Sequence, residues 1–210
     1  MSTLIDNSLF RSAVIALAYF LTAELGHLVT VFPGWSISLF WPPSGIALAA
    51  VFLFRFSAAP GIFLGAFASN LMQMPSASDP AMLLTCVGIS LSSTAAALIA
   101  GLLAARISAT NTLWESASQA LQAAGAMGLA CIVAAAGGVG SLYIAGIIPE
   151  ERLTGAMSMW WLGDFSGMLI FAPTTYLAIR LLFPLEGEFP AQHVLRPAIY
   201  SAGLAAAGLG

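Results

Sequence analysis

Long apolar stretches alternate along the chain with short breaks rich in proline, glycine, serine and asparagine. A helix that crosses a membrane needs about 20 predominantly apolar residues, and most of these stretches approach or exceed that length. The pattern therefore predicts an all-α fold, a polytopic bundle of transmembrane helices. Seven spans are predicted, with approximate bounds at 9–32, 43–54, 58–74, 81–105, 116–148, 157–183 and 196–210.

Two of these stretches depart from the usual length of a span. Residues 43–54 are short, unless the chain from Trp35 also lies in the membrane, and residues 116–148 are long. The glycines within 137–140 mark a place where we expect a kink or a break. Length alone leaves open whether 116–148 forms one kinked helix or two.

The distribution of arginine predicts an orientation. If the N-terminus is cytoplasmic, only Arg152 falls outside, and the other arginines lie at cytoplasmic ends of spans, as the positive-inside rule expects: Arg11, Arg55, Arg106, Arg180 and Arg196. This agreement favours a single crossing for 116–148. The last stretch is still apolar at Gly210, so we expect a fragment of a longer protein with an eighth span. Residues 1–210 are predicted to form one integral-membrane domain.

Composition supports a lipid environment and excludes some partners. Hydrophobic residues make up 60% of the chain and charged residues only 7%, whereas an ordinary soluble domain carries about 25% charge. The lipid bilayer is therefore the expected surrounding. Six basic residues and a net charge of -3 argue against nucleic acid as a partner, because neutralising phosphates needs a basic face. Cys86 and Cys131 lie in apolar stretches and are expected to be buried, not disulfide-bonded.

Two carboxylates fall inside predicted spans, where ionisable groups are costly and indicate function. Counted from the outer ends of their spans, Glu24 and Asp164 both lie roughly 10 Å beneath the outer boundary, and we expect them to share a layer. His27 is on the same helical face as Glu24, nearer the surface.

Other polar and aromatic residues converge on the same outer half. Tryptophan offers a flat apolar wall with one N–H donor, and Pro43 begins a helix with free backbone N–H groups. We predict a small amphipathic pocket whose ligand-binding residues are Glu24, His27, Trp41, Pro43, Ser44, Gly45, Asn70, Trp160, Trp161 and Asp164.

Structural interpretations of these residues remain open. Glu24 and His27 can lock neighbouring helices together, Asn70 can bond between helices, and tryptophans near span ends often sit at the membrane interface. Glycines four residues apart, at Gly61 and Gly65 and again at Gly163 and Gly167, let backbones approach. We expect both pairs to pack within the bundle.

Motifs for catalysis or for a cofactor are not found. The sequence has no plausible Ser-His-Asp set, P-loop or dinucleotide-binding glycine motif, and two histidines with two scattered cysteines do not form a zinc site. We predict no enzymatic activity in this segment, no cofactor and no metal.

A family resemblance rests on three segments and a proline. They are Trp41-Pro42-Pro43-Ser44-Gly45; Gly61-x-x-x-Gly65 followed by Asn70; Trp160-Trp161-Leu162-Gly163-Asp164-x-x-Gly167; and Pro173. In order and spacing they resemble the bacterial membrane-associated sensor domain, type 1, over nearly the whole chain. Ser44 departs from the alanine often found there. The resemblance implies an eight-span input module of the inner membrane, fused to a cytoplasmic histidine kinase, diguanylate cyclase or cyclic-di-GMP phosphodiesterase.

The functional hypothesis is a sensory input domain. A small amphipathic ligand or a partner membrane protein would engage the outer pocket, and the signal would reach a cytoplasmic output enzyme, through which the protein would form a homodimer. The alternative is a small-solute or proton-coupled transporter that uses Glu24 and Asp164 as proton carriers.

Overall fold

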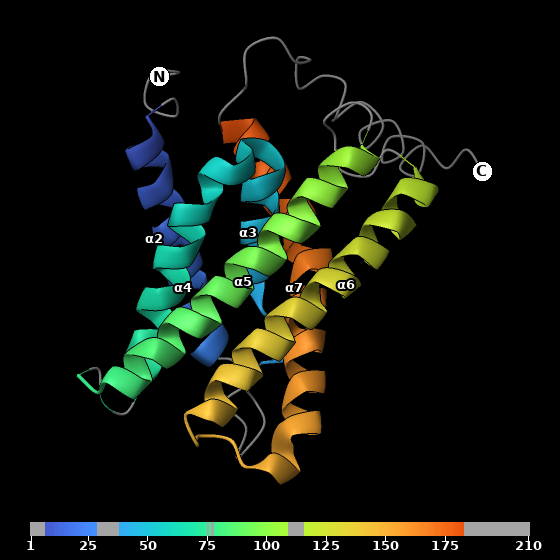
Figure 1. Ribbon diagram of the computed structural model, residues 1–210. Helices are drawn as coiled ribbons and strands as arrows, with labels where there is room; N and C mark the ends of the chain where they lie inside the picture. The colour runs from blue at the N-terminus through green and yellow to red at the C-terminus, as the bar shows by residue number, and fades with distance from the viewer. Residues whose placement is uncertain (1–6, 29–37, 75, 77, 109–115, 183–210) are drawn as a thin grey trace, which may run out of the picture. The chain divides into compact units, whose positions relative to one another are not determined.

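The computed structural model describes residues 7–28, 38–74, 76, 78–108 and 116–182, and within these ranges the chain is helical with no strand. Six α-helices follow one another (Figure 1), joined in two places by the short 3-10 helices η1 (Arg55–Ala58) and η2 (Glu150–Arg152). The α-helices are α2 (Ser8–Leu28), α3 (Pro42–Phe54), α4 (Ala59–Gln73), α5 (Pro80–Ile107), α6 (Ala117–Ile144) and α7 (Leu153–Leu182). Residues up to Tyr176 form one compact unit, and the site described below lies entirely within it.

Five stretches of the described chain are long and apolar enough to cross a membrane. They are Ser8–Leu28, Pro42–Gln73, Pro80–Ile107, Ala117–Ile144 and Glu150–Leu181. The predicted count of seven spans is therefore not supported. The second and third predicted spans fall together in Pro42–Gln73, as two helices that are each shorter than a bilayer requires. The seventh predicted span lies outside the described residues.

Helices α2 and α4 pack closely and run in the same direction. A Cβ atom added at Gly61 would lie 2.6 Å from the Ser12 carbonyl oxygen, and one at Gly65 would lie 2.7 Å from that of Ala16. A step of four residues along α4, from Gly61 to Gly65, corresponds to a step of four residues in the same direction along α2, so the two helices are parallel. The prediction that this glycine pair packs within the bundle is confirmed, because only glycine leaves room for such an approach.

Helix α3 runs opposite to α2, and this places a sharp reversal at η1. The guanidinium of Arg11, near the start of α2, lies 5.3 Å from the ring centre of Phe54, the last residue of α3. At the other end, Gly26 of α2 faces the indole of Trp41, just before α3. Since α4 is parallel to α2, the chain turns back between α3 and α4, where Arg55 has a φ of 56°.

The long stretch predicted at 116–148 forms one uninterrupted helix over Ala117–Ile144. The break expected at residues 137–140 is absent, because two of these glycines serve packing instead. Gly137 faces Ser92 of α5, and Gly138 faces the indole of Trp160 on α7. The interior around them is built largely from alanine, with both cysteines fully buried and not disulfide-bonded. Small side chains thus bring α5, α6 and α7 close together.

Candidate functional site

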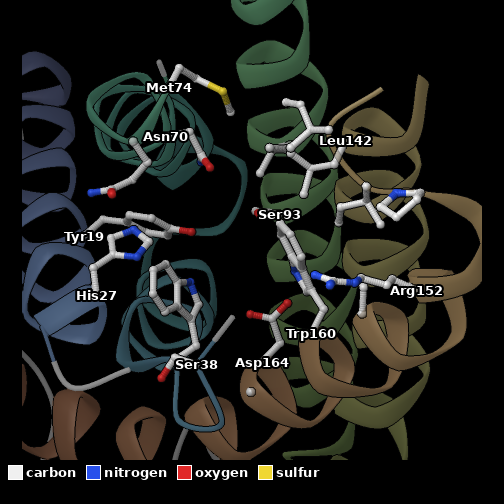
Figure 2. A pocket seen from close by; sticks show the side chains of 18 residues that line it. Tyr19, His27, Ser38, Asn70, Met74, Ser93, Leu142, Arg152, Trp160 and Asp164 are labelled. Carbon is white, nitrogen blue, oxygen red and sulfur yellow. The ribbon is translucent and has the colours of Figure 1, made fainter. Parts of the chain in front are cut away.

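A cavity of about 470 Å³ lies among α2, α4, α5, α6, α7, the segment before α3 and the turn between α6 and α7. Figure 2 shows Tyr19 and His27 on one side and Arg152, Trp160 and Asp164 on the other. The remaining wall is largely apolar, with Met74, Ile89, Leu142, Ile147, Ile148, Pro149 and Ala156. An apolar cavity with a few convergent polar groups is the usual form of a small-molecule site.

Asp164 is the buried carboxyl group of this cavity. Its side chain is only 4% exposed, and the Ser44 hydroxyl donates a hydrogen bond to Oδ1. The second oxygen, Oδ2, is also buried and makes no hydrogen bond among the described residues, although the Trp160 side chain lies close to this carboxyl group. Buried polar atoms nearly always have a partner, and leaving one unpaired costs about 1–3 kcal/mol or more for a charged group. Oδ2 is therefore an unsatisfied buried atom of a residue that lines the cavity.

An extended segment, residues 38–41, is held against α7 beside this carboxylate. The Trp41 N–H donates to the Gly163 carbonyl oxygen over 3.1 Å, and the Ser166 hydroxyl donates to the Leu39 carbonyl oxygen over 2.6 Å. A side chain at Gly163 or Gly167 would collide with backbone atoms of Ser38 or Trp41. The expectation that this second glycine pair packs within the bundle is confirmed, and the backbone that it accommodates is the non-helical segment before α3. Non-helical backbone at membrane depth is tolerated where it lines a cavity.

Aromatic side chains form a connected wall opposite Asp164. The Tyr19 side chain is 3% exposed and lies close to the Trp41 and Ser93 side chains. The His27 ring meets the Trp41 ring edge-on, with centres 5.0 Å apart. These contacts fix the orientation of the rings before any ligand arrives.

Arg152 supplies the cavity with a cation. It ends η2, is exposed, and reaches toward Trp160 and Asp164 in Figure 2. Within the described wall, Arg152 and Asp164 are the two residues of full opposite charge, one accessible and one buried. The site is therefore electrically asymmetric but has no net charge from these two groups.

The structure brings half of the predicted site residues to this cavity: His27, Trp41, Asn70, Trp160 and Asp164. Glu24 is not part of the wall and does not meet Asp164. It accepts hydrogen bonds from Ser69 over 2.9 Å and from Gln73 over 3.5 Å, both on α4. This arrangement corresponds to the interpretation that Glu24 joins neighbouring helices.

The remaining predicted residues do not line the cavity but pack against the residues that do. Ser44 holds Asp164, while Gly45 packs against Phe171 and Gly167 of α7, and Pro43 is buried at the start of α3. The Trp161 indole N–H donates to the Gly128 carbonyl oxygen over 2.8 Å, and its ring stacks on Phe165. These contacts give Trp161 a role in packing α7 against α6, away from the cavity.

Five polar residues of the wall were not predicted from the sequence: Tyr19, Ser38, Gln73, Ser93 and Arg152. Tyr19 lies about two helical turns before His27, so helical periodicity places both on one face of α2. Ser93 lies in a run of small polar residues, and Arg152 follows two glutamates in a turn, where a charge is ordinarily solvated. Only the fold reveals that these two face a cavity. Within the described ranges, no cluster of three or more histidine, cysteine or acidic residues is arranged to hold a metal ion.

Comparison with known families gives one match. The MASE1 family model matches residues 11–205, nearly the whole chain. No curated protein matches, and neither does any solved structure.

Proposed function

Because the chain belongs to the MASE1 family of membrane sensor domains, we propose that the cavity at Asp164 receives the stimulus of a sensory input domain. The observation that carries this proposal is the unpartnered, buried Oδ2 in the cavity wall. Such a group lowers stability unless something pairs with it, and a ligand is the partner that a cavity admits. Membership of the MASE1 family supports the sensory role. The buried carboxyl group of Asp164 supports this cavity as the position where the stimulus acts.

Helix α7 is the proposed carrier of the signal. Asp164 lies on α7 and is tied to α3 through Ser44, and its neighbour Trp160 packs on Gly138 of α6. A ligand at Oδ2 therefore acts where three helices meet. It shifts the population of helix arrangements only if it binds one arrangement more tightly than another. Helix α7 leads toward the C-terminus, where we propose that a cytoplasmic histidine kinase or cyclic-di-GMP enzyme follows and forms a homodimer.

We further propose that the cavity opens to the outside of a bacterial inner membrane. Arg11 lies beside the end of α3, where Arg55 follows. The end of α5, with Arg106, lies there too, because Gly101 of α5 faces Val51 of α3. Three arginines thus gather at the end away from the cavity, as expected for a cytoplasmic face.

The test compares two carboxylates in the intact signalling protein. The Asp164→Asn variant keeps an acceptor for Ser44 but loses its charge, and we expect a several-fold change in output activity with normal membrane insertion. The Glu24→Gln variant is the matched control, since Glu24 lies outside the cavity wall. Wild-type output and response in the Asp164→Asn variant would contradict the proposal. Solute uptake into proteoliposomes that is lost in that variant would favour a transporter instead.

A further inference from the structure

The two charged residues of the cavity wall do not select a charged ligand. Arg152 already interacts with another part of the chain. The Asp164 side chain is only 4% exposed and its Oδ2 is buried, so a ligand reaches that oxygen only after the wall has moved. A charged group that enters the cavity therefore loses its hydration without a counter-charge within reach, which is costly.

His27 has open hydrogen-bonding capacity on the cavity wall. Its side chain is half-buried and lines the cavity near the end of α2. The ring meets the Trp41 ring edge-on, and neither ring nitrogen makes a hydrogen bond with another described residue. A neutral imidazole has one donor and one acceptor, and a hydroxyl group of a ligand has both as well. A hydroxyl group is therefore a natural partner for this ring.

Asn70 provides a second open group, from the helix that packs beside α2. Its amide nitrogen donates to the Ala66 carbonyl oxygen over 2.8 Å, one turn earlier in α4. This bond identifies the nitrogen end of the amide, and the oxygen, Oδ1, is an acceptor with no hydrogen bond among the described residues. Figure 2 shows His27 and Asn70 on the same side of the cavity. The open polar groups are thus neutral and gather on one side.

We propose that the ligand is a small uncharged molecule of the alcohol or phenol class, with its hydroxyl group bonded to His27 on the side where Asn70 offers a further acceptor. This inference rests on the proposed function of the cavity and adds the chemical class of the stimulus. The apolar body of the molecule lies against the ring surfaces of Trp41 and Trp160 and the aliphatic part of the wall. The cavity volume of about 470 Å³ is within the range of small-molecule sites.

The experiment measures the binding of four probes with one phenylbutyl body to the protein in nanodiscs of phosphatidylcholine, with empty nanodiscs as the blank. The probes end in a hydroxyl group, a carboxylate, an ammonium group or a plain methyl group: 4-phenylbutan-1-ol, 4-phenylbutanoate, 4-phenylbutylamine and butylbenzene. We expect the alcohol to bind about fivefold more tightly than butylbenzene, which is the equivalent of one neutral hydrogen bond. Both charged probes should bind at least about tenfold more weakly than the alcohol, because they lose hydration in the cavity.

Substitutions of His27 locate the hydroxyl group. The His27→Phe variant keeps a ring against Trp41 but removes both nitrogens, so the alcohol should lose its preference over butylbenzene. The His27→Gln variant again supplies a donor and an acceptor and should restore part of the preference. The Glu24→Gln variant is the control, since Glu24 does not line the cavity, and it should keep the full preference. Thermal unfolding midpoints establish that each variant is folded.

A further arm adds diacylglycerol, a membrane lipid with the same hydroxyl chemistry, to the nanodiscs. Competition with the alcohol assigns the ligand to the membrane, and lack of competition assigns it to the surrounding solution. Equal binding of butylbenzene, equal or tighter binding of a charged probe, or an unchanged preference in the His27→Phe variant would overturn the proposed ligand class. The receptor proposal fails by a different result, an output that is insensitive to Asp164→Asn.

Discussion

The Ser44 hydroxyl on α3 donates a hydrogen bond to Oδ1 of Asp164 on α7, and both side chains are buried. This bond joins two helices that are far apart in sequence and fixes the carboxylate at the cavity wall. The other carboxylate oxygen, Oδ2, is buried and makes no hydrogen bond among the described residues. One contact thus packs α3 against α7 and satisfies only half of a buried carboxyl group.

Removing this donor should destabilise the domain. The Ser44→Ala variant leaves both oxygens of Asp164 unpaired, and we expect a loss of about 1–3 kcal/mol of stability. Thermal unfolding of the purified domain in lipid measures this as a lower midpoint. The Ser57→Ala variant is the control, because Ser57 bonds only to the Phe54 carbonyl oxygen next to it. An equal midpoint for the two variants would argue against the Ser44 bond.

The approach of residues 38–41 to α7 makes a second prediction. The Gly167→Ala variant places a methyl group against the Trp41 carbonyl oxygen, so it should displace the segment and reduce stability. The Gly125→Ala variant is the control, since nothing lies within 4 Å of that position. Removing a helical glycine there should stabilise the domain by about 0.5–1 kcal/mol. Similar unfolding midpoints for both variants would contradict the close contact.

Adjacent tryptophans should have different roles. The Trp160→Phe variant alters the cavity wall beside Asp164 and should change the output activity of the full-length protein. The Trp161→Phe variant removes the hydrogen bond to Gly128 and should lower stability by about 1 kcal/mol, with output retained. Output assays and thermal unfolding of both variants separate the two roles. A change of output only in the Trp161→Phe variant would reverse the assignment of the cavity wall.

Labelling with a membrane-impermeant maleimide tests whether the cavity opens outward. The natural cysteines are fully buried, so the unmodified chain should label poorly. The Asn70→Cys variant places a thiol in the cavity wall and should react from the outer side of intact cells. The neighbouring Ser69→Cys variant should not react, because that position is buried against Glu24. Reaction of the Asn70→Cys variant only from the cytoplasmic side would invert the proposed orientation.

The sequence alone predicted the positions of the helices and identified the carboxyl groups that lie within them. Apolar length predicted each described helix to within a few residues, and the position of Asp164 in an apolar stretch predicted a buried carboxyl group that lines a cavity. Glu24 showed the same signal, yet the fold gives it Ser69 and Gln73 as partners. Both carboxylates lie in apolar stretches, so only tertiary contacts distinguish a satisfied group from an unsatisfied one.

The features that sequence did not predict depend on how segments meet. Alternation of apolar stretches cannot distinguish two short antiparallel helices from two full spans, and this produced the excess count at Pro42–Gln73. Glycine spacing predicted close approach at Gly163 and Gly167 but not that an extended segment would occupy the space. Arg152 resembled a solvated turn residue because nothing local indicates that the turn borders a cavity.

The output activity of the full-length signalling protein, measured for Asp164→Asn beside Glu24→Gln, tests the central claim most directly. We predict a several-fold change in output for the Asp164→Asn variant and wild-type output for the Glu24→Gln variant. Wild-type output in both variants would contradict the account.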